Sequence, residues 1–119
     1  SGDLLMVKIL ITGSRSILNK KRIFEILKEE LKEDDIIITG GASGADKTAI
    51  EYCEANNIKF ITIRPIDVSR KEDYLYRNTE MIGMADRVIA FWDGKSTGTG
   101  FTINYARKRG KDVKLFEFL

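Results

Sequence analysis

Five short apolar runs recur along the chain, separated by stretches of mixed polarity. They lie at residues 6–12 (MVKILIT), 35–39 (DIIIT), 58–63 (IKFITI), 86–92 (DRVIAFW) and 112–118 (DVKLFEF). Their length and their β-branched and aromatic residues predict β-strands. Runs that are almost wholly apolar are typical of strands buried on both faces, which requires helices on both sides of a parallel sheet.

The stretches between the runs have the period of amphipathic helices. Two of them carry an apolar face made of Ile23, Ile26, Leu27 and Leu31 in the first, and Ala45, Ala49 and Cys53 in the second. The regular alternation of strand and helix predicts an α/β fold, a three-layer Rossmann-like sandwich around a five-stranded, mainly parallel sheet. We take the strand order 3-2-1-4-5, the commoner topology of this class.

The composition narrows the class of protein. With 119 residues, 43% hydrophobic and 32% charged, the chain is expected to form one domain over residues 1–119. Residues 1–5 begin with Ser1 rather than Met, and we set them aside as a disordered end or a cloning remnant. No run is long enough to span a membrane and no signal peptide is visible, so we expect a cytoplasmic protein without membrane association.

Charge and reactive side chains exclude further functions. The 20 Lys and Arg residues are interspersed with 18 Asp and Glu, giving a formal charge of +2, so we do not expect a nucleic-acid partner. The chain has no histidine and one cysteine, Cys53, which we expect to be inert packing. We therefore expect no metal site and no required cofactor.

Unusual sequences follow each of the first four predicted strands: GSRS (13–16), GGASGAD (40–46), RP (64–65) and DGKSTGTG (93–100). The carboxyl ends of parallel strands share one edge of a sheet, where ligands bind in the crevice between the first and fourth strands. The candidate ligand-binding residues in these loops are Gly13, Ser14, Arg15, Gly40, Gly41, Ala42, Gly44, Ala45, Asp46, Asp93, Gly94, Ser96, Gly98 and Thr99.

The stretch GGASGADKT, residues 40–48, differs by one residue from a P-loop, which ends in Gly-Lys-Thr. Asp46 stands where a P-loop has glycine, and its carboxylate would repel a phosphate there. We interpret the stretch as a glycine-rich turn into a helix whose free amides bind a phosphate, with Lys47 on the helix surface. Asp46 either caps those amides, three residues after Ser43, or accepts hydrogen bonds from ligand hydroxyls.

Anion binding is expected at the second and fourth loops. Gly44 and Gly98 stand at predicted helix starts, where the absence of a Cβ lets backbone amides close on a phosphate. Arg15 or Arg77 would add charge-assisted hydrogen bonds. Tyr74 and Tyr76 are further candidates for the wall of the crevice.

Several segments, taken in order, resemble the SLOG superfamily of Rossmann-like proteins, and most of all its small YspA-type group: ITGSRS, TGGASGAD, YRNTEM and ADRVIAFWDGKSTGTGFTI, followed by ARKRGKDV. The similarity extends over nearly the whole chain. It implies binding of nucleotides or nucleotide-derived ligands. It also implies a homo-oligomer, most simply a dimer that pairs through helices beside the site. Tyr74, Tyr76 and Met81, on the helical segment after the third strand, are the candidates for exposed residues at the dimer surface.

The LOG-type phosphoribohydrolases of this superfamily carry an Arg-Lys pair and, further on, a Gly-Thr pair followed by a catalytic Glu. Here Arg77 and Asn78 match the first pair, and Thr102 stands at the position of the Glu, three residues after Thr99. A hydroxyl does not stabilise a developing ribosyl cation as a carboxylate does.

The resemblance therefore favours a sensor or carrier domain that binds a nucleotide-like ligand, with Arg77, Asn78 and Thr102 added to its site. The alternative is an N-glycosidase acting on nucleoside 5′-monophosphates, in which Asp46 or Asp93 replaces the missing Glu. The superfamily also includes the DNA-processing protein DprA, and the near-neutral charge argues against a DprA-like binding of DNA.

Overall fold

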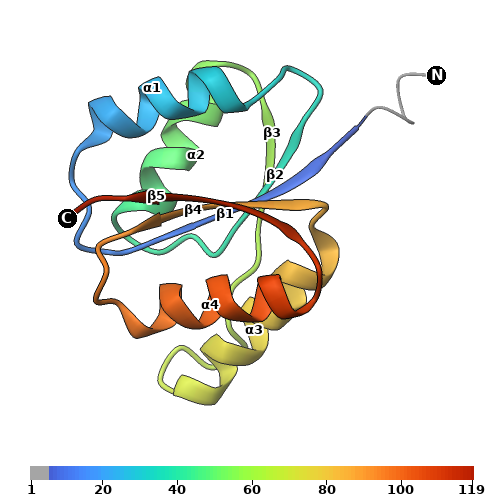
Figure 1. The fold of residues 1–119 in the computed structure, drawn as a ribbon. Helices are drawn as coiled ribbons and strands as arrows, with labels where there is room; N and C mark the ends of the chain where they lie inside the picture. The colour runs from blue at the N-terminus through green and yellow to red at the C-terminus, as the bar shows by residue number, and fades with distance from the viewer. Residues whose placement is uncertain (1–5) are drawn as a thin grey trace.

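The computed structural model describes residues 6–119, in which five strands alternate with four helices (Figure 1). The strands are β1 (Lys8–Gly13), β2 (Ile36–Thr39), β3 (Lys59–Thr62), β4 (Arg87–Trp92) and β5 (Asp112–Glu117). The helices are α1 (Lys20–Glu30), α2 (Ala45–Ala55), α3 (Lys71–Met84) and α4 (Thr97–Lys108). The expectation for residues 1–5 lies outside the described residues.

All five strands are parallel and lie in the order β3-β2-β1-β4-β5, which confirms the predicted fold class and topology. β1 pairs with β2 on one side and with β4 on the other. The chain therefore changes direction across the sheet between β1 and β4. The loops that follow these two strands lead to opposite faces and leave a crevice beyond the carboxyl ends of the strands.

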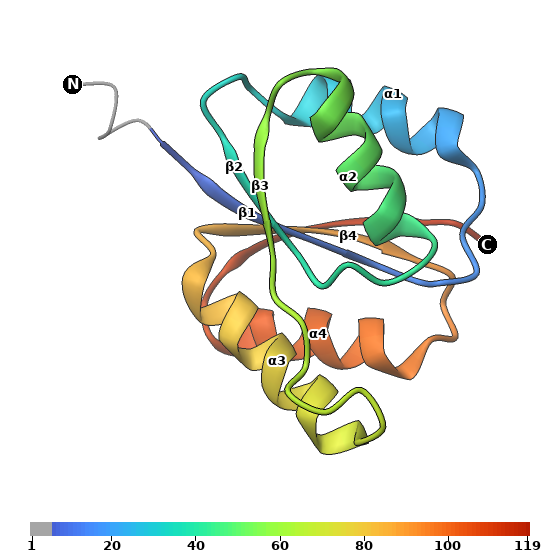
Figure 2. The ribbon, with the colours of Figure 1, turned by 180° about the vertical axis from the view of Figure 1, so that it is seen from behind.

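Helices cover both faces of the sheet. Figures 1 and 2 show α1 and α2 on one face and α3 and α4 on the other. Successive side chains of β1 enter different cores, because Ile9 and Ile11 pack on the α1 and α2 side while Leu10 packs on the α3 and α4 side. This double burial is the physical reason for the uninterrupted apolar run in β1.

The two edge strands depart from that expectation. Exposed and half-buried residues alternate along β3, and β5 has no fully buried residue. The helical layers cover the middle of the sheet, so burial on both faces holds for β1, β2 and β4 only. Among residues 6–119, no helix is long and apolar enough to cross a membrane.

Two expectations about single side chains have different outcomes. Cys53 is buried, and burial raises the pKa of its thiol to about 11, as suits an inert packing residue. Met81 is also buried, in the core between α3 and the sheet, so its prediction as an exposed pairing residue is wrong. Of the three residues expected at a dimer surface, Tyr76 is exposed, and the homo-oligomer itself stays a prediction.

Candidate functional site

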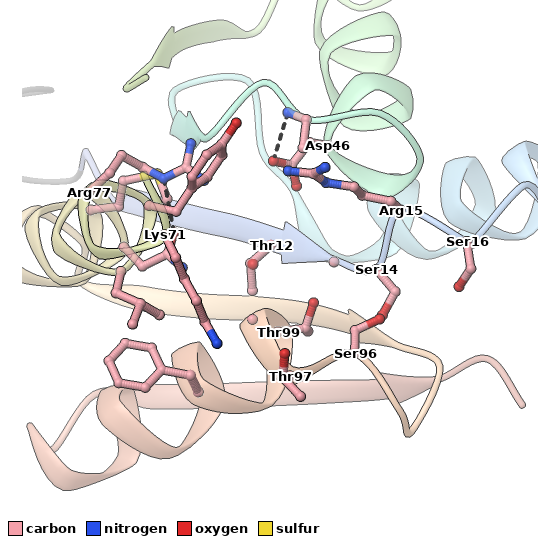
Figure 3. A pocket seen from close by; sticks show the side chains of 18 residues that line it. Thr12, Ser14, Arg15, Ser16, Asp46, Lys71, Arg77, Ser96, Thr97 and Thr99 are labelled. Carbon is pink, nitrogen blue, oxygen red and sulfur yellow. Dashed lines mark hydrogen bonds between the residues drawn. The ribbon is translucent and has the colours of Figure 1, made fainter. Parts of the chain in front are cut away.

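A cavity of about 560 Å³ opens at the carboxyl edge of the sheet, between the loops that follow β1 and β4 (Figure 3). Ten of the residues proposed from the sequence line it: Gly13, Ser14, Arg15, Ala42, Asp46, Arg77, Asn78, Ser96, Gly98 and Thr99. The cavity is therefore shared by the loops that follow β1, β2 and β4, the start of α2, the side of α3 and the start of α4.

The start of α4 forms one wall of the cavity. Thr97, Gly98 and Thr99 occupy its first turn, and Ser96 precedes them without a side-chain cap hydrogen bond. The first amides of a helix lack partners within it and carry the positive end of the helix dipole. A Cβ added to Gly98 would meet no atom within 4 Å, so the space beside these amides is open.

Two cationic side chains reach the cavity from exposed positions. Arg15 follows β1, and Lys71 begins α3. The Arg15 guanidinium lies 5.7 Å from the centre of the Tyr74 ring, which also lines the cavity. Neither cation forms an ion pair with a described residue, so both are available to a bound anion.

Arg77 has a different position from the one expected. It is buried, and its Nη1 donates hydrogen bonds to the carbonyl oxygens of Gly40 and Ile63, each at 3.0 Å. Its Nε donates to Oδ1 of Asn78 at 2.9 Å. A Cβ on Gly40 would collide with the guanidinium. Arg77 therefore first holds the end of β2, the end of β3 and α3 together, and only part of its guanidinium remains for a ligand.

The glycine-rich loop after β2 is shaped by protein contacts. Gly44 is the N-cap of α2 with φ +78°, and a Cβ there would lie 2.6 Å from the carbonyl oxygen of Arg15 and 2.7 Å from that of Ser14. The absence of a Cβ at Gly44 thus lets the β1–α1 loop approach, and a phosphate at this turn stays a prediction. Lys47 is exposed and outside the cavity, in agreement with the interpretation that this is no P-loop.

Asp46 lies in the first turn of α2 and is almost completely buried against the cavity. Its Oδ2 accepts a hydrogen bond from the Ala42 amide at 3.2 Å, whereas its Oδ1 is buried without a partner among the described residues. Because the helix cap is Gly44, the capping box expected from Ser43 does not form. Burial raises the pKa of Asp46 to about 6, although the Ala42 amide first, and then the Arg77 charge, the Gly40 amide and the Arg15 charge, counteract the shift.

Asp93 builds the β4–α4 loop. Its carboxylate accepts hydrogen bonds from the Ser16 hydroxyl at 2.7 Å, from the amides of Lys95 and Ser96 at 2.8 Å each, and from the Ser96 hydroxyl. The Ser16 hydroxyl first, and then the amides, hold the pKa of Asp93 far below its usual range. Asp93 does not line the cavity, and its oxygens fix the loop that presents α4.

The remaining candidates lie behind the cavity wall. The Thr102 hydroxyl donates to the Gly98 carbonyl at 3.0 Å, and its side chain is buried. Ala45 packs against Gly13, where a Cβ would collide with it. Gly41 and Gly94 have positive φ angles of 69° and 79° and shape their turns. The residues outside the cavity lining are Gly40, Gly41, Gly44, Ala45, Asp93, Gly94 and Thr102.

Sequence reasoning missed several residues of the wall: Thr12, Ser16, Lys71, Leu75, Met81, Thr97 and Phe101. Ser16 and Thr97 lie within loops that were singled out. Met81 lies four residues after Arg77 on α3, and Leu75 lies three residues before Asn78. The helical period from Arg77 and Asn78 would therefore have found both. Tyr74 lines the cavity as expected, whereas Tyr76 points to solvent.

Three solved structures share this fold. DNA processing protein A (DprA) from Streptococcus pneumoniae matches with a TM-score of 0.80 and 21% identity, over 94% of this chain and 50% of its own. DprA from Helicobacter pylori matches with a TM-score of 0.75 and 22% identity, over 92% of this chain and 64% of its own. The protein TM1055 matches with a TM-score of 0.71 and 18% identity, over 91% of this chain and 72% of its own. This chain thus spans less than two thirds of either DprA protein.

The Helicobacter pylori structure concerns a mode of single-stranded DNA binding. It contradicts our expectation about nucleic acid, because a protein with this fold and a low sequence identity binds DNA. The expectation rested on the net charge of the whole chain, and net charge averages over the surface. Here Arg15, Lys71 and Arg77 gather at one edge, so a near-neutral total does not exclude a polyanion.

No curated protein matches the chain. The family model described as the YspA, cpYpsA-related SLOG family matches residues 7–69, which contain β1, α1, β2, α2 and β3. This region holds the GSRS loop and the glycine-rich loop, the two segments on which the resemblance rested first. The chain therefore belongs to the YspA, cpYpsA-related SLOG family.

Proposed function

We propose that this chain binds a phosphorylated, nucleotide-like ligand in the edge cavity and acts as a sensor or carrier domain without turnover. The observation that carries the proposal is the wall made by the start of α4. Its uncapped amides, the open space beside Gly98 and the unpaired cations Arg15 and Lys71 converge on one cavity. Helix amides together with cationic side chains are a common protein site for phosphate.

The size and wall of the cavity support a ligand larger than phosphate. About 560 Å³ is within the range of small-molecule sites. Leu75, Met81 and Phe101 supply apolar surface, and Phe101 offers an aromatic ring. A nucleobase is flat and largely apolar on its faces, so it suits this part of the wall while its phosphate lies at α4.

A matched pair of glycine variants tests the phosphate position. Gly98→Ala and Gly83→Ala each add a methyl group in a helix where no atom lies within 4 Å, but only Gly98 lines the cavity. We expect Gly98→Ala to weaken binding of nucleoside 5′-monophosphates by about tenfold or more, the scale of one lost charge-assisted hydrogen bond. Isothermal titration calorimetry with the four common ribonucleoside monophosphates measures the change.

Gly83→Ala is expected to bind like the unmodified protein, because its methyl group lies on the exposed side of α3. Equal affinities of the two variants would place the phosphate elsewhere. If no monophosphate bound the unmodified chain at millimolar concentration, the proposal of a nucleotide site would be rejected.

Single-stranded nucleic acid is a second candidate ligand, favoured by the DNA binding of the Helicobacter pylori protein. A strand would use the same phosphate site but would extend along the edge of the sheet. Fluorescence anisotropy of a labelled oligothymidylate separates the two ligands. Tight, salt-dependent binding of the oligonucleotide together with weak binding of all monophosphates would favour the nucleic acid.

A further inference from the structure

The wall opposite the phosphate site has a different chemistry. Figure 3 shows Asp46 and Arg15 on one side of the end of β1 and Thr97 and Thr99 on the other, so Arg15 belongs to the same wall as Asp46 and would reach a phosphate at α4 from across the cavity. A carboxylate repels a phosphate, so the part of the ligand that reaches Asp46 is uncharged or cationic. The two walls therefore receive different parts of one molecule.

Asp46 offers an acceptor that the protein itself leaves unused. Its Oδ1 is buried and has no hydrogen-bond partner among residues 6–119. A buried polar atom without a partner costs free energy, and native structures fill most such positions with protein groups, water or a ligand. Arg77 lies close enough to act on Asp46 electrostatically, but its Nη1 and Nε are already engaged with two carbonyl oxygens and with Asn78.

Asn78 offers a donor with a fixed orientation. Its Oδ1 accepts the hydrogen bond from the Nε of Arg77. Because an Arg Nε only donates, the amide oxygen of Asn78 must face Arg77, and the amide nitrogen is left for another partner. Asn78 lines the same cavity as Asp46. The cavity thus combines an unused acceptor and an oriented donor around Arg77.

Hydroxyl groups match this pair, because each can donate to a carboxylate and accept from an amide nitrogen. We propose that Asp46 and Asn78 recognise the ribose hydroxyls of the ligand, so that the site selects ribonucleotides over analogues that lack the 2′-hydroxyl or the 3′-hydroxyl. This inference rests on the proposed nucleotide site and adds the class of sugar. A site built to hydrogen-bond a hydroxyl discriminates strongly against the analogue that lacks it, since its own polar groups are then left unpaired.

The test compares matched sugars on the full chain. Calorimetry at pH 7.5 gives the dissociation constants of the four ribonucleoside 5′-monophosphates, their 2′-deoxy and 3′-deoxy counterparts, and inorganic phosphate. We expect each ribonucleotide to bind at least tenfold more tightly than one of its two deoxy counterparts. Inorganic phosphate, which has no sugar, reports on the phosphate site alone.

Two isosteric variants assign the effect to the named atoms. Asp46→Asn removes the carboxylate, and Asn78→Asp keeps an acceptor for Arg77 but removes the donor. Each is expected to reduce the ratio of deoxy to ribo dissociation constants toward one while the affinity for inorganic phosphate changes less than threefold. Lys47→Ala, on the exposed surface of the same helix as Asp46, is the control and should leave the ratio unchanged.

Equal binding of ribonucleotides and both deoxy series would overturn the inference and leave the nucleotide site intact. The inference is equally rejected if the deoxy nucleotides bind more tightly, or if Asp46→Asn weakens inorganic phosphate as much as it weakens the ribonucleotides. If neither phosphate nor any nucleotide binds, the proposed function fails, and the sugar preference fails with it.

Discussion

Asp46 shows how one residue can oppose the stability of the fold that contains it. The fold places its carboxylate in a buried position, beside Arg77 but without an ion pair to it. Burial favours the neutral form, so the pKa rises to about 6 from an ordinary value of 3.8. A residue that costs stability in this way is a candidate for function rather than for packing.

The pH dependence of stability follows from this shift. The folded state binds the Asp46 proton more tightly than the unfolded chain, so its contribution to stability is present below about pH 4 and is lost as pH rises through 6. Asp46→Asn has no such loss. At about 1.4 kcal/mol per pKa unit, we expect the variant to be more stable by roughly 2–3 kcal/mol at pH 7.5 and by nearly nothing at pH 4.

Urea unfolding of both proteins at the two pH values measures this difference. Glu51, half-buried on the same helix and paired with Lys20 at the surface, supplies the control, because Glu51→Gln should change the free energy of unfolding by less than 1 kcal/mol at either pH. A variant that is destabilised at pH 7.5 would mean that the Asp46 carboxylate finds a partner in solution.

At the scale of elements, the two glycine-rich helix starts have opposite tasks. The start of α2 packs against the β1–α1 loop, and the amide of Ala45 approaches the Ser14 carbonyl at 3.5 Å. The start of α4 faces open space, with no neighbour near Gly98. Similar sequences thus give one helix end that is used for packing and one that is free for a ligand.

We therefore expect Gly44→Ala to lower the free energy of unfolding by about 2–4 kcal/mol, because an alanine at φ +78° is strained and its Cβ meets the Ser14 and Arg15 backbone. Gly98→Ala, in a helix with free space, should raise it by up to about 1 kcal/mol. Thermal and urea denaturation of the two variants measure both changes in the free energy of unfolding. A stable Gly44→Ala protein that no longer binds nucleotide would support our first interpretation of Gly44.

The sequence predicted the fold well because burial on both faces leaves a direct trace in β1, β2 and β4, and because strand-helix alternation restricts the topology. It also located the shared edge, since the loops after β1 and β4 must meet there. It could not predict that Arg77 is buried, because its partners are the backbone carbonyls of Gly40 and Ile63, which no residue type encodes. The same holds for Gly44, whose neighbours are backbone atoms.

On the scale of the whole molecule, charge is distributed unevenly in spite of a total of +2. Three cations line the edge cavity with a single carboxylate, Asp46, while much of the acidic surface lies elsewhere, as at Glu51 and Glu30. An anion that enters the edge therefore meets a positive field that the net charge does not reveal. This local field, together with the parallel sheet that gathers the loops, is what the proposed function requires of the fold.

The last prediction concerns turnover, which the whole arrangement argues against. Cleavage of an N-glycosidic bond requires a carboxylate beside the ribosyl carbon to stabilise the developing cation. Thr102 stands at the matching position, and its hydroxyl is bonded to the Gly98 carbonyl. Asp93 holds its loop with both oxygens, which leaves Asp46 as the only carboxylate among the described residues that line the cavity.

We expect prolonged incubation of the protein with each ribonucleoside 5′-monophosphate to release no free base above the rate without protein, as measured by liquid chromatography. Asp46 is the carboxylate that we assign to hydrogen bonding with the ligand hydroxyls, and one of its oxygens is already held by the Ala42 amide. Release of base that disappears in Asp46→Asn would instead establish the glycosidase alternative and give Asp46 the role of the missing Glu. Release that persists in Asp46→Asn would indicate a contaminating enzyme, because no other carboxylate of the described chain lines the cavity.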